Sequence, residues 1–433
     1  MPRKKPHRIG DPDPNRLENA IPRAIRDANI DELRLHIQRA QENDLLSDAL
    51  IKNAMRTACE KDSLEALRFL LEHAKPYHVN NGQAKTNETL LMIAKSSEVA
   101  QLLLDNGAKV NAIDTFGRTA LMHAASKEIA MLFIKHGADI ETNHQQARCA
   151  LMHVLMQDKP STFDARTEIA HYLIHNGANL TAVDTQQRTL LMTAVWRNNI
   201  SVVRTLLEKV DVNATDLRGR NLLHHLCEDR DRASRMLSSP IDADKLIADL
   251  VLASKVQINV QDAYEGKTPL HRATERNNVY LVQALLNRPQ TEIDILDFRG
   301  KTSLHVAAAN AHKELLELLL SKGADAKAES DGGWTPLHNA AAGKGKGRDI
   351  IVKILLSRGA SPTARLRTGK LPLHLACEAG DVEVVKLLLE QPNVNITARD
   401  YDGNTPLISA AKLGHTHIVK QLDASQQPRL GSV

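Results

Sequence analysis

Apolar residues recur along the chain in short helical stripes separated by polar turns. In the segment 302–323, a short stripe contains Leu304 and Ala307, and after a polar bend a longer leucine-rich stripe begins at Leu315. Both stripes have the three- and four-residue spacing of an α-helix that buries one face. The pattern predicts a short helix followed by a longer one, and Gly323 ends the second helix in a left-handed conformation.

This helix pair returns about twelve times, at intervals close to 33 residues. Its marker is a Thr-Pro-Leu-His phrase, clearest at 335–338 and 268–271. Threonine suits the N-cap of a helix, and proline suits its first turn, where no amide hydrogen is needed. The units begin near Asn19, Asn53, Thr89, Thr119, Cys149, Thr189, Asn221, Thr268, Thr302, Thr335, Leu371 and Thr405. Such a repeat predicts a solenoid in which each unit packs on its neighbours.

These motifs resemble those of the ankyrin-repeat family. The likeness lies in the Thr-Pro-Leu-His phrase, in Gly-Ala-Asp turns at 137–139 and 323–325, and in leucine runs such as 387–389. The resemblance covers about residues 16–424 and implies an all-α solenoid of about twelve stacked repeats with finger-like β-turns. It also implies protein recognition through the fingers and the concave face.

The repeats are uneven in length. The units at Thr89 and Thr119 are about three residues short between their helices, and the largest insertion covers about 228–244. We interpret this insertion as a surface excursion, with a neutral loop insertion as the alternative. The expected divisions are a flexible basic tail at 1–15, a solenoid at 16–424 (capping unit 16–52, irregular half 53–220, unit with the insertion 221–262, regular half 263–424) and a flexible tail at 425–433.

Composition and charge narrow the kinds of partner. The formal net charge is +4 and 25% of the residues are charged, so charge alone does not argue for nucleic acid. No apolar run is long enough to span a membrane, and no apolar segment of a secretory signal follows the basic N-terminus. We expect a monomer that binds protein in the cytoplasm and binds neither nucleic acid nor membrane; a host cell after secretion and the nucleus are alternative locations.

Histidines and cysteines are abundant enough to raise the question of chemistry. Cys59, Cys227 and Cys377 occupy the same place in three units, which indicates packing, and no metal-site spacing occurs. Several histidines lie at or beside the motif position of successive units, so they do not converge: His123, His153, His224, His225, His271, His305, His338 and His374. The glycine- and lysine-rich stretch 343–348 is interpreted as a flexible bend. We expect no catalytic, cofactor or metal site.

Basic residues precede the motif threonine position in seven units. They are Arg118, Arg148, Arg188, Arg220, Lys267, Lys301 and Lys370. Aspartates such as Asp114, Asp184 and Asp216 lie close by, so one interpretation is a solvated edge with locally compensated charge. The other is a binding strip for an acidic partner segment.

Aromatic residues concentrate in the finger turns. Only 3% of the residues are aromatic, yet Phe116, Tyr264, Phe298, Trp334 and Tyr401 all fall there. Exposed aromatic rings are common anchors of protein interfaces, whereas the alternative is that each ring stacks on the neighbouring finger. We expect the C-terminal half to be the main recognition surface, with Trp334 the strongest candidate.

The sequence therefore favours a non-enzymatic interaction scaffold or adaptor that binds a partner segment of acidic and apolar character. A bacterial secreted effector acting on host proteins and a regulator that binds a transcription factor are alternatives. An enzyme is disfavoured because ankyrin-bearing enzymes carry a separate catalytic domain, for which the repeats leave no room.

Overall fold

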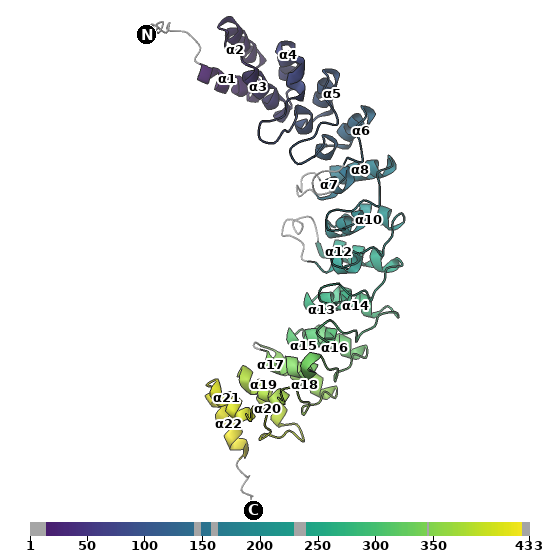
Figure 1. Ribbon diagram of the computed structural model, residues 1–433, viewed down its shortest axis with the longest axis vertical. Helices are drawn as coiled ribbons and strands as arrows, with labels where there is room; N and C mark the ends of the chain where they lie inside the picture. Colours follow the sequence, from purple (N-terminus) through teal and green to yellow (C-terminus); the bar gives the residue numbers. More distant parts are fainter. Residues whose placement is uncertain (1–13, 143–148, 157–162, 229–239, 344–345, 427–433) are drawn as a thin grey trace, which may run out of the picture. The chain divides into compact units, whose positions relative to one another are not determined.

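The computed structural model describes residues 14–142, 149–156, 163–228, 240–343 and 346–426. In these residues the chain is helical, with one isolated bridge between Val183 and Thr189, so the predicted all-α class is confirmed. The chain forms two compact units, which we call the N-terminal unit (through Val210) and the C-terminal unit (from Asp211). Each unit is a succession of helix pairs (Figure 1). Most of the expected tails and most of the insertion at 228–244 lie outside the described residues; at the edges of the expected tails, α1 already begins at Pro14 and α22 continues to Gln426.

The N-terminal unit contains six helix pairs in its described part. They are α1 (Pro14–Arg26), α2 (Ile30–Glu42), α3 (Asp48–Glu60), α4 (Leu64–His73), η2 (Leu90–Ile93), α5 (Ser97–Asp105), η3 (Leu121–His123), α6 (Lys127–Lys135), α7 (Ala150–Met156), α8 (Phe163–His175), α9 (Leu190–Trp196) and α10 (Ile200–Leu207), with a further turn η1 (Pro76–Asn80) after α4. In the units at Thr89 and Thr119 the first helix is reduced to the 3-10 turns η2 and η3. This agrees with the short segments expected there.

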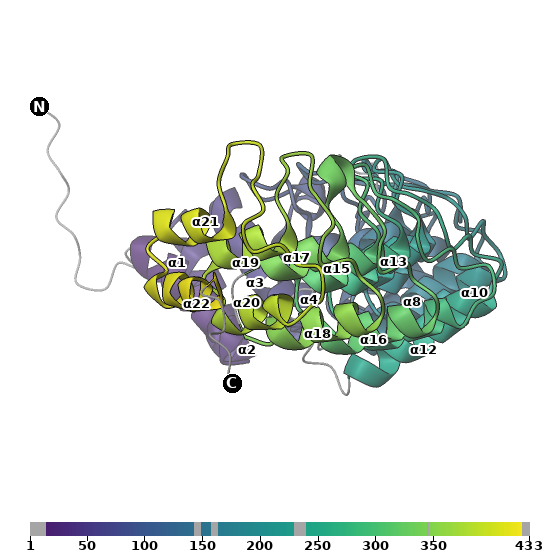
Figure 2. The same cartoon turned by 90° about the horizontal axis from the view of Figure 1, so that it is seen from below.

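The C-terminal unit also contains six pairs in its described part. They are α11 (Leu222–Leu226), α12 (Pro240–Ala253), α13 (Pro269–Glu275), α14 (Val279–Leu286), α15 (Ser303–Ala309), α16 (Lys313–Ser321), α17 (Pro336–Ala342), α18 (Arg348–Ser357), α19 (Pro372–Ala379), α20 (Val382–Leu389), α21 (Pro406–Lys412) and α22 (Thr416–Gln426), with the short turn η6 (Asp331–Gly333) before α17. First helices pack on first helices and second helices on second helices, which gives two layers. Figure 2 shows the finger turns projecting together beside the first-helix layer.

The Thr-Pro-Leu-His phrase ties each repeat to the next one. The backbone N–H of Thr268 donates to Nδ1 of His271 (3.2 Å), and Nε2 of His271 donates to the carbonyl of Lys301 in the next repeat (2.9 Å). His224, His305 and His374 make the same contact with the following finger. The local bonding role expected for these histidines is therefore confirmed.

The four cysteines lie in the packed interior. All are buried and free, and burial raises the pKa of Cys59, Cys227 and Cys377 to about 12. Thiols of this kind are protonated and inert at neutral pH, as expected for packing residues.

Arg348 departs from the expectation for the stretch 343–348. It is the first residue of α18, it is buried, and its guanidinium donates to the carbonyl of Ala309 at the end of α15 (2.7 Å). The interpretation of this residue as part of a flexible bend is wrong, because Arg348 fixes the start of a helix. Lys344 and Gly345 lie outside the described residues.

Candidate protein-interaction surface on the finger turns

Six finger turns of the C-terminal unit are joined into one structure, which we call the finger ribbon. Its fingers are 216–220, 262–267, 297–301, 330–334, 366–370 and 400–404. In each finger the first residue's N–H donates to the last residue's carbonyl, as from Asp262 to Lys267 (3.0 Å). The second residue's N–H donates to the preceding finger, as from Phe298 to Glu265 (2.8 Å). Because these bonds run from finger to finger, the ribbon is a continuous and preorganised surface.

Glycine permits this close spacing. Gly266 and Gly369 have positive φ values of 66° and 79°, which a glycine adopts readily. A side chain at Gly266 would collide with the ring of Phe298, and one at Gly369 would lie 2.7 Å from the ring of Tyr401. These two rings therefore rest on the preceding finger, as the stacking alternative expected.

The same rings nevertheless face solvent. Phe298 is 61% exposed and Tyr401 76%, so one face is supported while much of the ring remains accessible. Tyr264 is 72% exposed, and the guanidinium carbon of Arg218 lies 5.8 Å from its ring centroid. These three aromatic side chains form an accessible row with a gap: Tyr264 and Phe298 lie on adjacent fingers, and Tyr401 lies three fingers further on.

Trp334 and Phe116 differ from this row. Trp334 is only partly exposed, and its ring lies 6.2 Å from that of His338 on its own repeat. It occupies the last position of its finger, which Lys301 and Lys370 occupy in theirs, and side chains there lie back over the first helix. Phe116 belongs to the N-terminal unit, where it is 51% exposed, with the Arg118 guanidinium carbon 4.8 Å from its ring centroid.

Three of the arginines that precede the motif threonine position are described, and each is held by an aspartate of its own finger. Arg118 contacts Asp114 at 2.6 Å, Arg188 contacts Asp184 at 2.7 Å, and Arg220 contacts Asp216 at 2.6 Å. Burial alone would raise the pKa of these aspartates, but hydrogen bonds and the arginine charges hold it below the usual value. The local charge compensation is therefore present at these positions. Arg148 lies outside the described residues.

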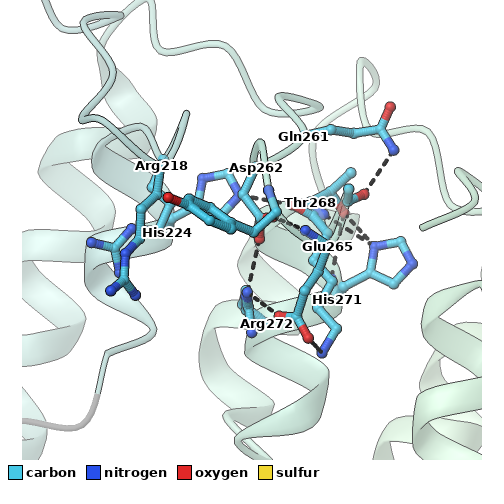
Figure 3. Close-up of polar contacts among 12 residues, drawn as sticks. Arg218, His224, Gln261, Asp262, Glu265, Thr268, His271 and Arg272 are labelled. Atoms are coloured by element: carbon cyan, nitrogen blue, oxygen red, sulfur yellow. Dashed lines mark hydrogen bonds and ion pairs between the residues drawn. The ribbon is translucent and has the colours of Figure 1, made fainter. Parts of the chain in front are cut away.

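The lysines at the equivalent position are bound in different ways. Lys267 contacts Glu275 at 3.0 Å, within a network in which Arg272 joins Asp262 and Glu265 (Figure 3). Lys370 contacts Glu378 at 2.7 Å. Lys301 is partly buried and forms no ion pair within the described part of the chain.

Several exposed ribbon residues were missed by sequence reasoning. They occupy the second or third finger position, or the position just before the finger: Leu217, Arg218, Leu296, Arg299, Arg365, Arg367 and Arg399. These residues could have been recognised from their position within each finger turn, because the second and third positions form the tip.

The described residues contain neither a candidate metal site nor a helix that could span a membrane. Among the described residues, no group of three histidine, cysteine, aspartate or glutamate side chains could hold a metal ion. No helix within the described ranges is both long and apolar enough to cross a bilayer.

Comparison with known proteins identifies the family. A family model described as ankyrin repeats (3 copies) matches residues 23–114, 95–184, 161–249, 236–330, 289–366 and 346–428. The chain therefore belongs to the ankyrin-repeat family. Ankyrin repeats are generally protein–protein interaction modules, and the family is typically non-enzymatic.

Individual relatives match only parts of the chain. The Homo sapiens transient receptor potential cation channel subfamily A member 1 is 30% identical over 217 residues, which is 43% of this chain and 19% of that protein. The Gallus gallus nuclear factor NF-kappa-B p105 subunit is 31% identical over 167 residues, 33% of this chain and 17% of that protein. The Bos taurus SMC5-SMC6 complex localization factor protein 1 is 38% identical over 122 residues, 28% of this chain and 10% of that protein. The matches thus span less than a fifth of these relatives.

Proposed function

We propose that this protein is a non-enzymatic scaffold or adaptor that holds a partner protein on the finger ribbon. The observation that carries the proposal is the row of exposed rings at Tyr264, Phe298 and Tyr401 on a hydrogen-bonded ribbon. Large aromatic side chains on a rigid surface are strong interface anchors, because little side-chain and backbone freedom is lost when they bind.

The residues proposed to contact partners differ in their contribution. The exposed rings supply apolar contact, while Arg220, Lys267 and Lys370 form a polar rim whose charges are already compensated within the chain. The complete proposed set is Phe116, Arg118, Arg188, Arg220, Tyr264, Lys267, Phe298, Lys301, Trp334, Lys370 and Tyr401. Within this set, their exposure favours Tyr264, Phe298 and Tyr401 over Trp334 as main anchors.

The setting in which the protein acts is part of the proposal. Four free, buried cysteines fit a reducing compartment, so we place the protein in the cytoplasm. We propose that it acts there as a monomer, with each repeat stabilised by adjacent repeats of the same chain.

The proposal is tested with the double variant Tyr264→Ala/Phe298→Ala of the full chain. Partners are crosslinked to the wild-type protein in cells, identified, purified and titrated against each variant by calorimetry. Each lost anchor is expected to weaken binding by about 2 kcal/mol, without a loss of helical content.

The matched control is Ile350→Ala, which removes an exposed apolar side chain from the second-helix layer of the same unit. Partner affinity equal to wild type in both variants would contradict the proposal. Melting temperatures measured in parallel show whether either variant has lost its fold.

A further inference from the structure

Two fingers of the ribbon lack the carboxylate that the other four carry at their first position. The finger 330–334 begins with Ser330 but carries Asp331 next to it, whereas the finger 366–370 carries no acid at all. Asp216, Asp262, Asp297 and Asp400 begin four of the fingers and are buried, and each accepts backbone N–H bonds from its own turn. Asp216 and Asp262 also form ion pairs with arginines. These fingers therefore contain their own counter-charge.

The finger 366–370 begins with a leucine instead. Leu366 is buried at the position of the aspartates, while its neighbours Arg365 and Arg367 are exposed. The finger also ends in Lys370, so this segment carries three cations and no acid. Only Lys370 finds a described carboxylate, that of Glu378 on α19.

Hydrogen bonds fix two of the arginines against the backbone. Nη1 of Arg365 donates to the carbonyl of Gly369 (2.9 Å) and to that of Arg399 on the approach to the next finger (3.2 Å). Nη1 of Arg399 donates to the carbonyl of Gly403 (2.7 Å). Each guanidinium is thereby oriented, and its other nitrogens remain available because each guanidinium offers five donors.

The result is a basic patch beside an aromatic ring. We call Arg365, Arg367 and Arg399 the arginine patch; all three are exposed and form no ion pair within the described residues. Tyr401, on the next finger, lies against Gly369 of the finger 366–370 and presents most of its ring to solvent.

The nearby acids do not cancel the patch. Asp400 is buried and its carboxylate accepts bonds from the backbone of Asp402 and Asn404. The exposed carboxylates of the adjoining fingers are Asp331 and Asp402 at the tips and Glu329 just before the finger 330–334, at the position that Arg365 holds before its own finger. A partner must therefore bring its negative charges onto the 365–367 segment and avoid these three acids, which gives the site a preferred register.

We propose that the arginine patch and Tyr401 bind an extended, carboxylate-rich protein segment with an apolar or aromatic side chain against the Tyr401 ring. Guanidinium groups pair with carboxylates through two parallel hydrogen bonds, and oriented guanidiniums lose less freedom when they do so. The inference deepens the proposed function of the finger ribbon and rests on it.

The test uses the full chain and a short fluorescent peptide of alternating glutamate and tyrosine, with binding followed by anisotropy across a range of salt concentrations. Arg367→Glu is expected to weaken binding by about tenfold and to reduce its salt dependence. Arg299→Glu is the matched control, because Arg299 is an exposed arginine on a finger that retains its aspartate; it is expected to change affinity by less than about twofold.

A second variant distinguishes a loss of peptide binding from a loss of the fold. Leu366→Asp restores the residue found in four other fingers, so the finger is expected to fold and its added charge to weaken the peptide by several-fold. Thermal melting of each variant reports on the fold.

Two results would overturn the inference. One is an absence of peptide binding by the wild-type chain, and the other is an equal effect of Arg367→Glu and Arg299→Glu. If the natural partner depends on Tyr264 and Phe298 but is unaffected by Arg367→Glu, the inference fails while the proposed function stands.

Discussion

At the scale of single residues, the motif histidines couple the fold to pH. Burial lowers the pKa of His224, His305 and His338 from an ordinary value near 6.5 to about 4. The unfolded chain therefore binds these protons first as the pH falls, while the folded chain resists them. The stability contributed by the neutral imidazoles is complete above pH 6.5 and is lost as the pH falls toward about 4.

The first prediction concerns His305→Gln. Because glutamine does not titrate, this variant is expected to lose less stability than the wild type between pH 6.5 and 4, by about 1.4 kcal/mol for each unit of pKa difference removed. Urea denaturation at a series of pH values measures the slope. His175→Gln, at an exposed position, is the control variant. A slope for His305→Gln equal to that of the wild type would refute the assignment.

His225 contributes with the opposite sign. Burial lowers its pKa, but bonds to Asp216 and Glu228 raise it overall, so the stability that His225 contributes is lost as the pH rises.

Asparagine side chains form a second residue-scale link between repeats. Nδ2 of Asn259 donates to the carbonyl of Gln290 (2.8 Å), and its Oδ1 accepts from the N–H of Glu292 (3.1 Å). Asn80, Asn111 and Asn213 make the same pair of bonds. At the equivalent position Asp294 accepts from the N–H of Asp325, but a carboxylate has no N–H to donate to a carbonyl.

The second prediction follows from this missing donor. Asp294→Asn is expected to stabilise the protein by about 1 kcal/mol, because the amide completes the second hydrogen bond and removes the repulsion from Asp325. Asn259→Asp is the reverse substitution and should destabilise by a similar amount. Chemical denaturation of both variants provides the measurement. Destabilisation by Asp294→Asn would show that the backbone at this repeat cannot accept the asparagine geometry.

At the scale of helices, Arg348 joins three elements. From the start of α18 its guanidinium donates to Ala309 at the end of α15, and it makes longer contacts to the carbonyls of Asn339 and Ala340 on α17 (both 3.4 Å). A cation at helix C-termini meets carbonyls that lack helical partners and the negative end of each helix dipole. Gly343 leaves the room for it, since a side chain there would overlap the guanidinium.

The third prediction is that Arg348→Met destabilises the C-terminal unit by about 2–4 kcal/mol, because several buried carbonyls lose a charged donor. The matched control is Arg358→Met at the exposed C-cap of the same helix, expected to change stability by less than about 0.5 kcal/mol. Differential scanning calorimetry distinguishes them. Equal melting temperatures for the two variants would mean that the Arg348 contacts contribute no net stability.

Much of the helical architecture could be predicted from sequence, because apolar stripes and capping residues are local signals. Thr268 caps α13 and Pro269 opens it, as the phrase indicates. The accessibility of each finger side chain was harder to predict, since it depends on position within the turn and on the neighbouring finger. The sequence therefore favours Trp334 as an anchor, whereas in the structure its ring lies near that of His338 and Tyr264 is the more exposed residue. The arginine patch is hard to recognise in the sequence, because its distinguishing residue is Leu366. This leucine stands at a position where four other fingers carry an aspartate that compensates the positive charge.

At the scale of the whole molecule, contacts are local within each unit. In the described residues, a helix packs mainly on the other helix of its own pair and on helices of the adjacent pairs. Stability in such an array is a sum of repeat terms and neighbour terms, so damage to one repeat also weakens the repeats that pack on it.

The fourth prediction uses a buried charge to test this dependence. Leu304 is buried in α15, which packs against α13, α16 and α17, so Leu304→Asp places an unpaired carboxylate among apolar side chains. The expected cost is more than about 4 kcal/mol, which exceeds what one repeat can absorb. Hydrogen exchange should therefore accelerate in α13 and α17 as well as in α15, with smaller changes in α21. Phe298→Ala, at a finger tip of the same repeat, should leave exchange in these helices close to wild type. If exchange increased only within α15 and α16, each repeat would be independently stable. Contacts between neighbouring repeats would then not account for the preorganisation of the finger ribbon.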